Sequence, residues 1–238
     1  MEVQYRKEYS PALGRDMECK IYGHKGRPVL FIPCQDGRFF DFENFHMTDT
    51  WSPWLEAGEV MVFSIDTIDQ ETWSDTDGDP YWRIRRYEQW LQYITDEMVP
   101  FMREIVNERN GWTGYPGIMV FGCSLGATHA ANLYFRRPDL FDRLLALSGL
   151  YSAGYGFGSC TDEVVRGIRW WISSVICQRM IQGSRCIISR KQLSASVRDH
   201  GNFRTPRGSS HRSWQRRISM PGWISGAMTV LTTGTGGI

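Results

Sequence analysis

The last third of the chain has almost no acidic residues. Residues 166–238 contain one, Asp199, against 12 lysine and arginine residues, whereas residues 1–165 contain 25 acidic and 15 basic residues. Long apolar runs are also missing: no stretch reaches the roughly 18 residues that a membrane-spanning helix needs. The first residues, Met1–Glu8, are too polar for a secretory signal peptide. We therefore expect a cytoplasmic protein without a membrane partner.

Cysteine is present without a pattern that would give it a structural role. The six cysteines contain no Cys-x-x-Cys pair and show no regular spacing, which excludes a zinc site or a disulfide framework of the usual kinds. The acidic run Asp75–Asp79 lacks the later bidentate glutamate of a calcium loop. We expect free thiols, no metal and no cofactor. The cysteines are Cys19, Cys34, Cys123, Cys160, Cys177 and Cys186.

Up to about residue 165 the local signals agree with one another. Apolar runs alternate with segments of helical period, which predicts βαβ units and a doubly wound α/β fold with a mostly parallel sheet. The predicted strands are Val3–Tyr9, Met17–Tyr22, Pro28–Pro33, Glu59–Ile65, Ile118–Cys123 and Arg143–Ser148, the first two forming an antiparallel pair. The predicted helices are Trp54–Ala57, Tyr81–Asn110 and a segment from Leu125 to Arg136.

Beyond Val165 this agreement ends. The segment is rich in serine, glycine and arginine, and has neither a sustained helical or strand period nor helix caps. We predict two parts, a partial α/β domain over residues 1–165 and a basic, disordered tail over residues 166–238. A tail of this composition can bind nucleic acid or an acidic surface, although no aromatic residues interleave with the basic ones as in a known binding module.

The segment Ile118–Arg136 carries the strongest chemical signal. A short apolar run meets Gly-x-Ser-x-Gly, formed by Gly122, Ser124 and Gly126, and passes directly into a helical sequence. A strand, a sharp turn and a helix in this order form the nucleophile elbow of serine hydrolases. The elbow exposes the Ser124 hydroxyl above the sheet and makes the Leu125 N–H available to an oxyanion. The alternative is a glycine-rich turn at the start of a helix.

Three further motifs accompany the elbow: Arg-Arg-Pro-Asp-Leu-Phe at 136–141, Ala-Leu-Ser-Gly at 146–149 and Ile-Pro-Cys-Gln-Asp-Gly at 32–37. Together they make residues 1–165 resemble the putative esterase family of the α/β-hydrolases. This family is related to esterase D, S-formylglutathione hydrolase, feruloyl esterases and mycolyltransferases. The resemblance implies an α/β-hydrolase sheet, incomplete here at its C-terminal end, and the hydrolysis of a small-molecule carboxylic ester.

The resemblance also implies site residues. Ser124 would be the nucleophile and Leu125 would supply one oxyanion donor. The second donor would come from the loop after the strand at 28–33, where Arg38 resembles the family position and Gln35 competes with it. The family order is serine, acid, histidine, but the family's later motifs are absent from the chain as written.

A shifted reading frame recovers these motifs. When the third base of each codon is combined with the first two of the next, residues 166–172, 175–182, 192–202 and 223–238 permit the missing motifs in the family order. The triad histidine would be encoded across Leu231 and Thr232, and the acid across Gly201 and Asn202. We therefore hypothesise a net one-base shift near residue 166, which makes the arginine-rich tail an out-of-frame product.

Other residues of the chain could substitute for the missing partners. His129 follows Ser124 on the same helix, so its side chain is expected to point away from the turn and either to serve helix packing or to lie on the surface. His46 could line the pocket. Asp66 and Asp69 could face the site, although loop carboxylates are more often solvated or capping. The remaining candidates are His24 in a predicted loop, His200 and His211 in the tail, and Trp51, Trp54, Trp73 and Trp82, which could line a pocket but are more consistent with core packing.

Two functional hypotheses follow. The first is a serine hydrolase of the esterase family that is inactive in this chain because the base and the acid are missing. The second is a non-catalytic protein whose basic tail binds nucleic acid or acidic partners.

Overall fold

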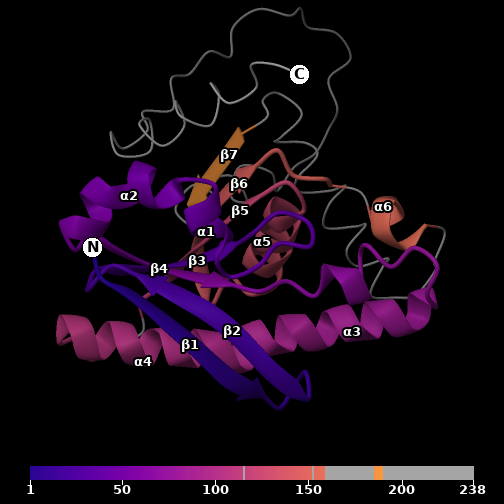
Figure 1. Ribbon diagram of the computed structural model, residues 1–238, viewed down its shortest axis with the longest axis horizontal. Coiled ribbons are helices and arrows are strands. Elements are labelled where there is room, and N and C mark those ends of the chain that lie inside the picture. Colours follow the sequence, from indigo (N-terminus) through magenta and orange to yellow (C-terminus); the bar gives the residue numbers. More distant parts are fainter. Residues whose placement is uncertain (115, 152, 159–184, 190–238) are drawn as a thin grey trace, which may run out of the picture.

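The structure, a computed structural model, describes residues 1–114, 116–151, 153–158 and 185–189. Its centre is a seven-stranded sheet with the order β1-β2-β4-β3-β5-β6-β7 (Figure 1). The strands are β1 (Val3–Ser10), β2 (Arg15–Tyr22), β3 (Arg27–Ile32), β4 (Val60–Ile65), β5 (Ile118–Cys123), β6 (Phe141–Leu147) and β7 (Arg185–Ser189).

The middle of the sheet is parallel and its edges are antiparallel. Strands β4, β3, β5 and β6 run in one direction, because β3 pairs in parallel with β4 and β5, and β5 with β6. Strands β1 and β2 form an antiparallel hairpin that joins the sheet through β4. The predicted α/β fold with a mostly parallel sheet and the predicted antiparallel pair are both confirmed.

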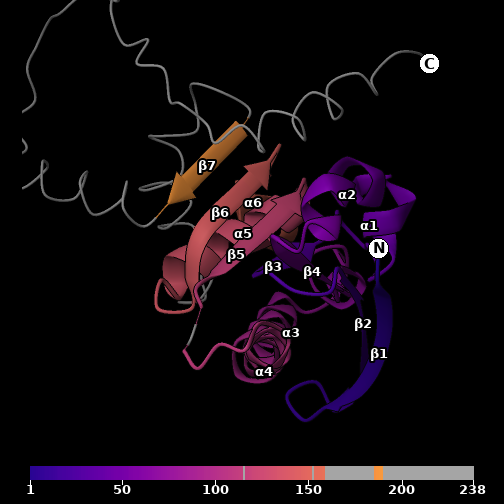
Figure 2. The same cartoon turned by 90° about the vertical axis from the view of Figure 1, so that its left-hand side faces the viewer.

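Helices cover both faces of the sheet. They are α1 (Asp41–Asn44), α2 (Met47–Glu56), the 3-10 turn η1 (Asp69–Glu71), α3 (Pro80–Gln92), the π-helical segment η2 (Tyr93–Met98), α4 (Val99–Asn110), α5 (Leu125–Arg136) and α6 (Ala153–Phe157). Figure 2 shows α1 and α2 on one side of the central strands and the α3–α4 helix on the other.

Two hydrophobic cores follow from the alternation of side chains along the strands. In β3, Leu30 and Ile32 join the core beneath α3, α4 and α5, whereas Val29 and Phe31 join the core beneath α1 and α2. Since both faces of the central strands are covered, β4 and β5 are buried almost throughout. This explains why these strands are continuous apolar runs in the sequence.

The predicted long helix at Tyr81–Asn110 is confirmed with one refinement. It begins at Pro80, where Asp79 caps the N–H groups of Tyr81 and Trp82, and it passes through the π-helical segment η2. It ends at Asn110, where Gly111 adopts a left-handed conformation with φ of 64°.

The sequence-based prediction differs from the structure at two short elements. It placed a helix at Trp54–Ala57, but α2 begins at Met47, because His46 ends the preceding turn with φ of 53°. It expected no regular structure beyond Val165, but Arg185–Ser189 forms β7, which pairs antiparallel with β6. The other residues from 159 onwards lie outside the described part of the chain.

Candidate active site

Ser124 occupies the sharp turn between β5 and α5. Its backbone has φ of 54° and ψ of −125°, a conformation that costs a non-glycine residue on the order of 1–3 kcal/mol. The Ser124 N–H donates to the carbonyl oxygen of Leu147 at the end of β6 (2.9 Å). This bond holds the turn at the carboxyl edge of the parallel strands, where active sites of doubly wound sheets lie.

The two glycines of the motif are required by close backbone contacts. A Cβ atom at Gly122 would lie 2.2 Å from the carbonyl oxygen of Gly126, across the turn. A Cβ atom at Gly126 would lie 2.1 Å from the carbonyl oxygen of Pro33 and 2.4 Å from that of Ile32, at the end of β3. The motif therefore packs the start of α5 directly against the loop that follows β3.

The Leu125 N–H belongs to the first turn of α5, where backbone N–H groups have no partner within the helix. Within the described part of the chain it has no hydrogen-bond acceptor. It lies next to Ser124 at the positive end of the helix dipole, so this position suits an oxyanion.

The loop after β3 contains both candidates for a second donor. The Arg38 N–H donates to the carboxylate of Asp41 (3.0 Å), so it is already engaged. The Gln35 N–H has no acceptor among the described residues. The Arg38 side chain is also engaged, because its guanidinium binds Asp66 and Glu18. Of the two candidates, the geometry favours Gln35.

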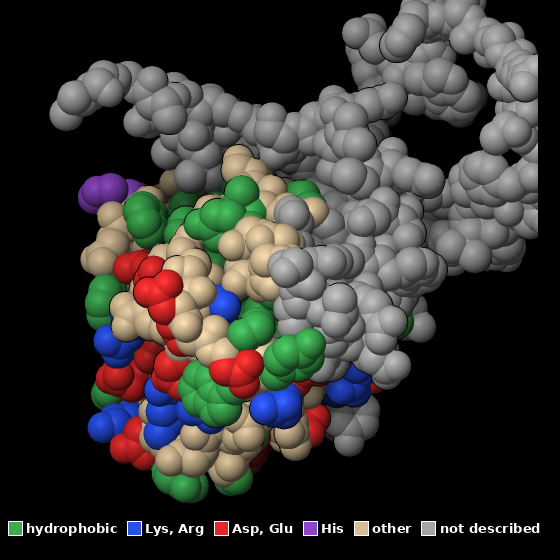
Figure 3. Space-filling model, turned by 90° about the vertical axis from the view of Figure 1, so that its right-hand side faces the viewer, with side chains coloured by type: hydrophobic (Ala, Val, Ile, Leu, Met, Phe, Trp, Pro, Cys, Tyr) green, Lys and Arg blue, Asp and Glu red, His purple; other side chains and the backbone are tan. Residues whose placement is uncertain are grey.

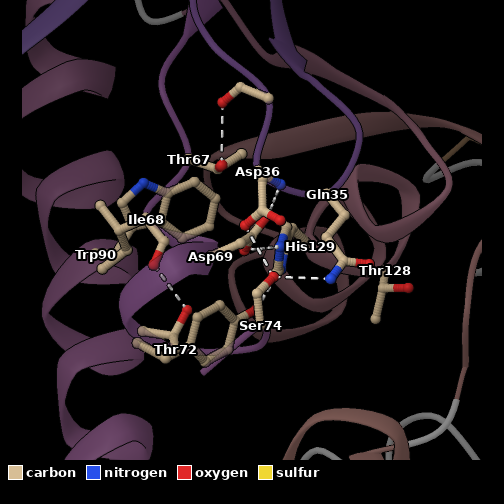
Figure 4. Close-up of polar contacts among 12 residues, drawn as sticks. Gln35, Asp36, Thr67, Ile68, Asp69, Thr72, Ser74, Trp90, Thr128 and His129 are labelled. Atoms are coloured by element: carbon tan, nitrogen blue, oxygen red, sulfur yellow. Dashed lines mark hydrogen bonds and ion pairs between the residues drawn. The ribbon is translucent and has the colours of Figure 1, made fainter. Parts of the chain in front are cut away.

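The loop after β4 clamps the loop after β3. The Asp66 carboxylate accepts the N–H of Phe39 and the Nε–H of Arg38, both at 2.8 Å. Burial raises the pKa of Asp66 even though Arg38 acts in the opposite direction. The Asp69 carboxylate accepts the N–H of Asp36 at 3.2 Å (Figure 4). Both aspartates are therefore buried loop anchors rather than solvated carboxylates.

His129 does not approach Ser124. It is fully buried on α5, as the expected packing role requires, but it also has two polar partners that the sequence did not reveal. Its Nε2 lies 3.0 Å from Asp69 (Figure 4). Its Nδ1 lies 3.0 Å from the Tyr87 hydroxyl on α3. No local sequence signal connects these residues, because they come from three separate elements.

The other two histidines in the described part of the chain are not placed for catalysis either. His46 is exposed at the start of α2, and its nearest ionic partner is Asp49 (3.4 Å). His24 lies between β2 and β3, at the opposite end of the parallel strands from Ser124. His200 and His211 lie outside the described residues.

The tryptophans are divided between core and surface. Trp51 stacks on Phe121 in the core beneath α1 and α2, and Trp73 packs on His129 in the other core. Core packing, the preferred interpretation, is confirmed for these two. Trp54 is partly buried, whereas Trp82 is exposed.

The acidic run has local structural roles. The Asp75 carboxylate accepts the Gly78 N–H (3.0 Å), and Asp79 caps α3. Within the described residues, no group of three or more histidine, cysteine or acidic side chains could hold a metal ion.

Two hollows lie beside the loop after β3. One, of about 400 Å³, is polar and includes Asp36, Arg38 and Asp66. The other, of about 500 Å³, includes Tyr81, Tyr155 and Phe157. The Tyr155 hydroxyl donates to the Gln35 side-chain oxygen (2.9 Å), which connects the lining of the second hollow to the loop after β3.

One face of the described part of the chain is electrostatically mixed. In Figure 3 acidic and basic side chains lie next to one another, with hydrophobic side chains between them. Several pairs are ionic, such as Arg136 with Glu88 (2.7 Å). In the sequence, the excess of basic over acidic residues lies in residues 166–238. No helix in the described part of the chain is long and apolar enough to cross a bilayer.

The sheet order, the strained serine and its two glycine contacts define the chain as an α/β-hydrolase. The model of the family described as Putative esterase matches residues 10–218, and the chain belongs to this family. The chain is therefore classed as a carboxylic ester hydrolase of the serine hydrolase type. The match extends 53 residues beyond position 165.

Solved structures agree on the fold. A ferulic acid esterase is 15% identical with a TM-score of 0.52, and the match covers 72% of this chain and 70% of that one. An S-formylglutathione hydrolase from Agrobacterium tumefaciens is 14% identical with a TM-score of 0.53, over 71% of this chain and 69% of that one. No curated protein matches the sequence.

Proposed function

We propose that Ser124 is the nucleophile of an ester hydrolase that works through an acyl-enzyme. The observation that carries this proposal is the strained backbone of Ser124 between two glycines that cannot carry a side chain. Strain of this kind persists where the surrounding structure holds it in place, and it concentrates at functional sites. In the proposed reaction the Ser124 oxygen attacks the ester carbonyl, the alcohol leaves, and water then releases the carboxylic acid.

The proposed oxyanion hole consists of the N–H groups of Leu125 and Gln35. Both lack an acceptor among the described residues, and the contact between Gly126 and Pro33 brings their chain segments together. Two convergent N–H groups stabilise the negative oxygen of the tetrahedral intermediate. Arg38 remains the alternative donor, and it would first have to release Asp41.

The proposed base and acid are absent from the chain as written. Among the described residues no histidine hydrogen-bonds to Ser124, and His129 already has Asp69 and Tyr87 as partners. We propose that a one-base shift near residue 166 removed both groups, so that this chain is inactive. Without the base and its carboxylate, most of the rate enhancement is lost and only oxyanion and binding contributions remain.

A fluorophosphonate probe tests this proposal. We expect labelling of Ser124 to be slow in the chain as written, and absent in Ser124→Ala. Rapid labelling at Ser124 would contradict the proposed inactivity. Measurable labelling of Ser124→Ala at the same rate as the original chain would show that Ser124 is not the nucleophile.

The charge of residues 166–238 supports a second candidate function, the binding of nucleic acid or an acidic partner. Twelve basic residues and one acidic residue give this segment a strong positive charge. A gel shift that weakens steeply with salt, and that depends on this segment, would support it. No binding at low salt would exclude it.

We also propose a cytoplasmic location. Cys19, Cys34 and Cys123 are free thiols, the usual state in a reducing compartment. Separation of cell fractions followed by immunodetection would test this.

A further inference from the structure

The loop that would carry the second oxyanion donor is held in an unfavourable conformation by a buried carboxylate. Asp36, next to Gln35, has φ of 59°, in the left-handed region. Its N–H donates to Asp69 Oδ2 (3.2 Å), and its own carboxylate accepts from the Ser74 hydroxyl (2.8 Å). Ser74 in turn accepts from the Gln35 side chain (2.7 Å), so both residues of the loop are attached to the segment after β4 (Figure 4).

The second oxygen of Asp69 leads into the protein interior. Asp69 Oδ1 lies 3.0 Å from His129 Nε2, and both side chains are almost completely buried. His129 Nδ1 lies 3.0 Å from the Tyr87 hydroxyl, to which the Asn132 amide nitrogen donates (3.1 Å). A continuous hydrogen-bond chain therefore connects the loop after β3 with helices α3 and α5.

The hydrogen-bond partners allow an arrangement of protons in which each proton has an acceptor. In one such arrangement the Asn132 amide nitrogen donates to the Tyr87 oxygen, and the Tyr87 hydroxyl donates to His129 Nδ1. The Nε2 proton of a neutral His129 then goes to Asp69. Burial raises the pKa of Tyr87, which keeps this hydroxyl protonated. A neutral imidazole and an ionised Asp69 leave each of these protons with an acceptor.

Packing alone does not explain a histidine at this position. Its ring lies among Trp73, Tyr87 and Trp90, with centroid distances of 5.6, 5.3 and 5.1 Å, a setting that an apolar side chain would fill. A polar group buried there is costly unless its hydrogen bonds are made. What His129 adds is a fixed orientation of the Asp69 carboxylate.

His129 also lies on the helix that begins with the Leu125 N–H. Two donors bind one oxyanion only if they are held in register with each other, to within about 0.5 Å. The chain from His129 through Asp69 to Asp36 joins the helix that carries one proposed donor to the loop that carries the other.

We infer that Asp69 and His129 are positioning residues, which hold the loop at Gln35 and Asp36 against α5 so that the two oxyanion donors converge. This inference rests on the proposed function for its assignment of Gln35 and Leu125. Neither positioning residue touches the substrate.

Hydrogen exchange of individual amides in the full chain tests the inference. In Asp69→Asn and His129→Leu we expect the Asp36 amide to exchange about tenfold faster, because its acceptor is lost or loses its orientation. The Phe39 amide is a matched internal control, since Asp66 rather than Asp69 accepts it, and its exchange should not change. His129→Gln retains a donor at a similar reach and should restore slow exchange at Asp36.

Three outcomes would overturn the inference: unchanged Asp36 exchange in His129→Leu, equal acceleration at Asp36 and Phe39, or a Gln variant that behaves like the Leu variant. If His129→Leu does not fold, Asp69→Asn and His129→Gln provide the same comparison. Ser124→Ala tests the proposed function by probe labelling and leaves Asp36 exchange unaffected. Failure of the inference and failure of the proposed function can therefore be distinguished.

Discussion

The position that a Cβ atom would occupy at Gly126 lies 2.1 Å from the carbonyl oxygen of Pro33. This contact brings the first turn of α5 against the end of β3, and with it the serine turn against the loop that contains Gln35. The close approach of these two backbones therefore brings the two segments of the candidate site together.

Replacing Gly126 by alanine should lower the free energy of unfolding by about 3 kcal/mol, because backbone atoms on both sides have to move apart. Urea unfolding followed by circular dichroism measures this change. Gly114→Ala is the matched control, since nothing lies within 4 Å of a Cβ atom there, and it should change stability by less than about 0.5 kcal/mol. Equal effects of the two substitutions would contradict the proposed contact.

Ser124→Gly should stabilise the fold while removing the proposed nucleophile. Relief of the strained backbone gains on the order of 1–3 kcal/mol, and the extra freedom of glycine in the unfolded chain offsets about 1 kcal/mol of it. We expect a net gain of about 1 kcal/mol in urea unfolding. Ser52→Gly, within α2, should instead lose about 0.5–1 kcal/mol. A loss of stability in Ser124→Gly would show that the turn is not strained.

Alkaline pH should destabilise the protein through a buried thiol. Burial raises the pKa of Cys19 to about 12, whereas an unfolded cysteine titrates near pH 8.5. Above the unfolded value the folded state binds more protons, so the stabilisation is complete below about pH 8.5 and is lost as pH rises towards 12. Each such thiol contributes a slope of about −1.4 kcal/mol per pH unit.

Urea unfolding between pH 8 and pH 10 measures this slope. Cys19→Ala should reduce its steepness by one thiol's contribution. Met17→Ala, at another buried position of β2, should lower stability equally at every pH and leave the slope unchanged. Identical slopes for the original chain and Cys19→Ala would refute the prediction. Above pH 10 buried tyrosines such as Tyr93 add to the effect, because burial raises the pKa of Tyr93.

Resequencing of the gene should reveal one base gained or lost near codon 166. Expression of the corrected frame should then give hydrolysis of short-chain p-nitrophenyl esters, and the chain as written should give none. A confirmed written frame would remove the hypothesis.

The sequence was sufficient for the elements whose signal is local. Buried parallel strands are continuous apolar runs, as in β4 and β5, and the Gly-x-Ser-x-Gly turn is visible because its glycines are adjacent in the chain. The bounds of the short elements were harder to predict from the sequence. The start of α2 at Met47 follows the left-handed backbone of His46, a conformation that histidine adopts more often than most residues but still uncommonly.

Tertiary structure decided which polar groups are free and which are engaged. The sequence favoured Arg38 over Gln35 as oxyanion donor, but only the folded loop shows that Asp41 occupies the Arg38 N–H. The pairing of His129 with Asp69 likewise joins residues 60 positions apart. The sequence by itself determined the fold class and the serine turn, since periodicity and adjacent glycines are local properties. The partners of each polar atom depend on the packing of distant segments, and no local pattern encodes them.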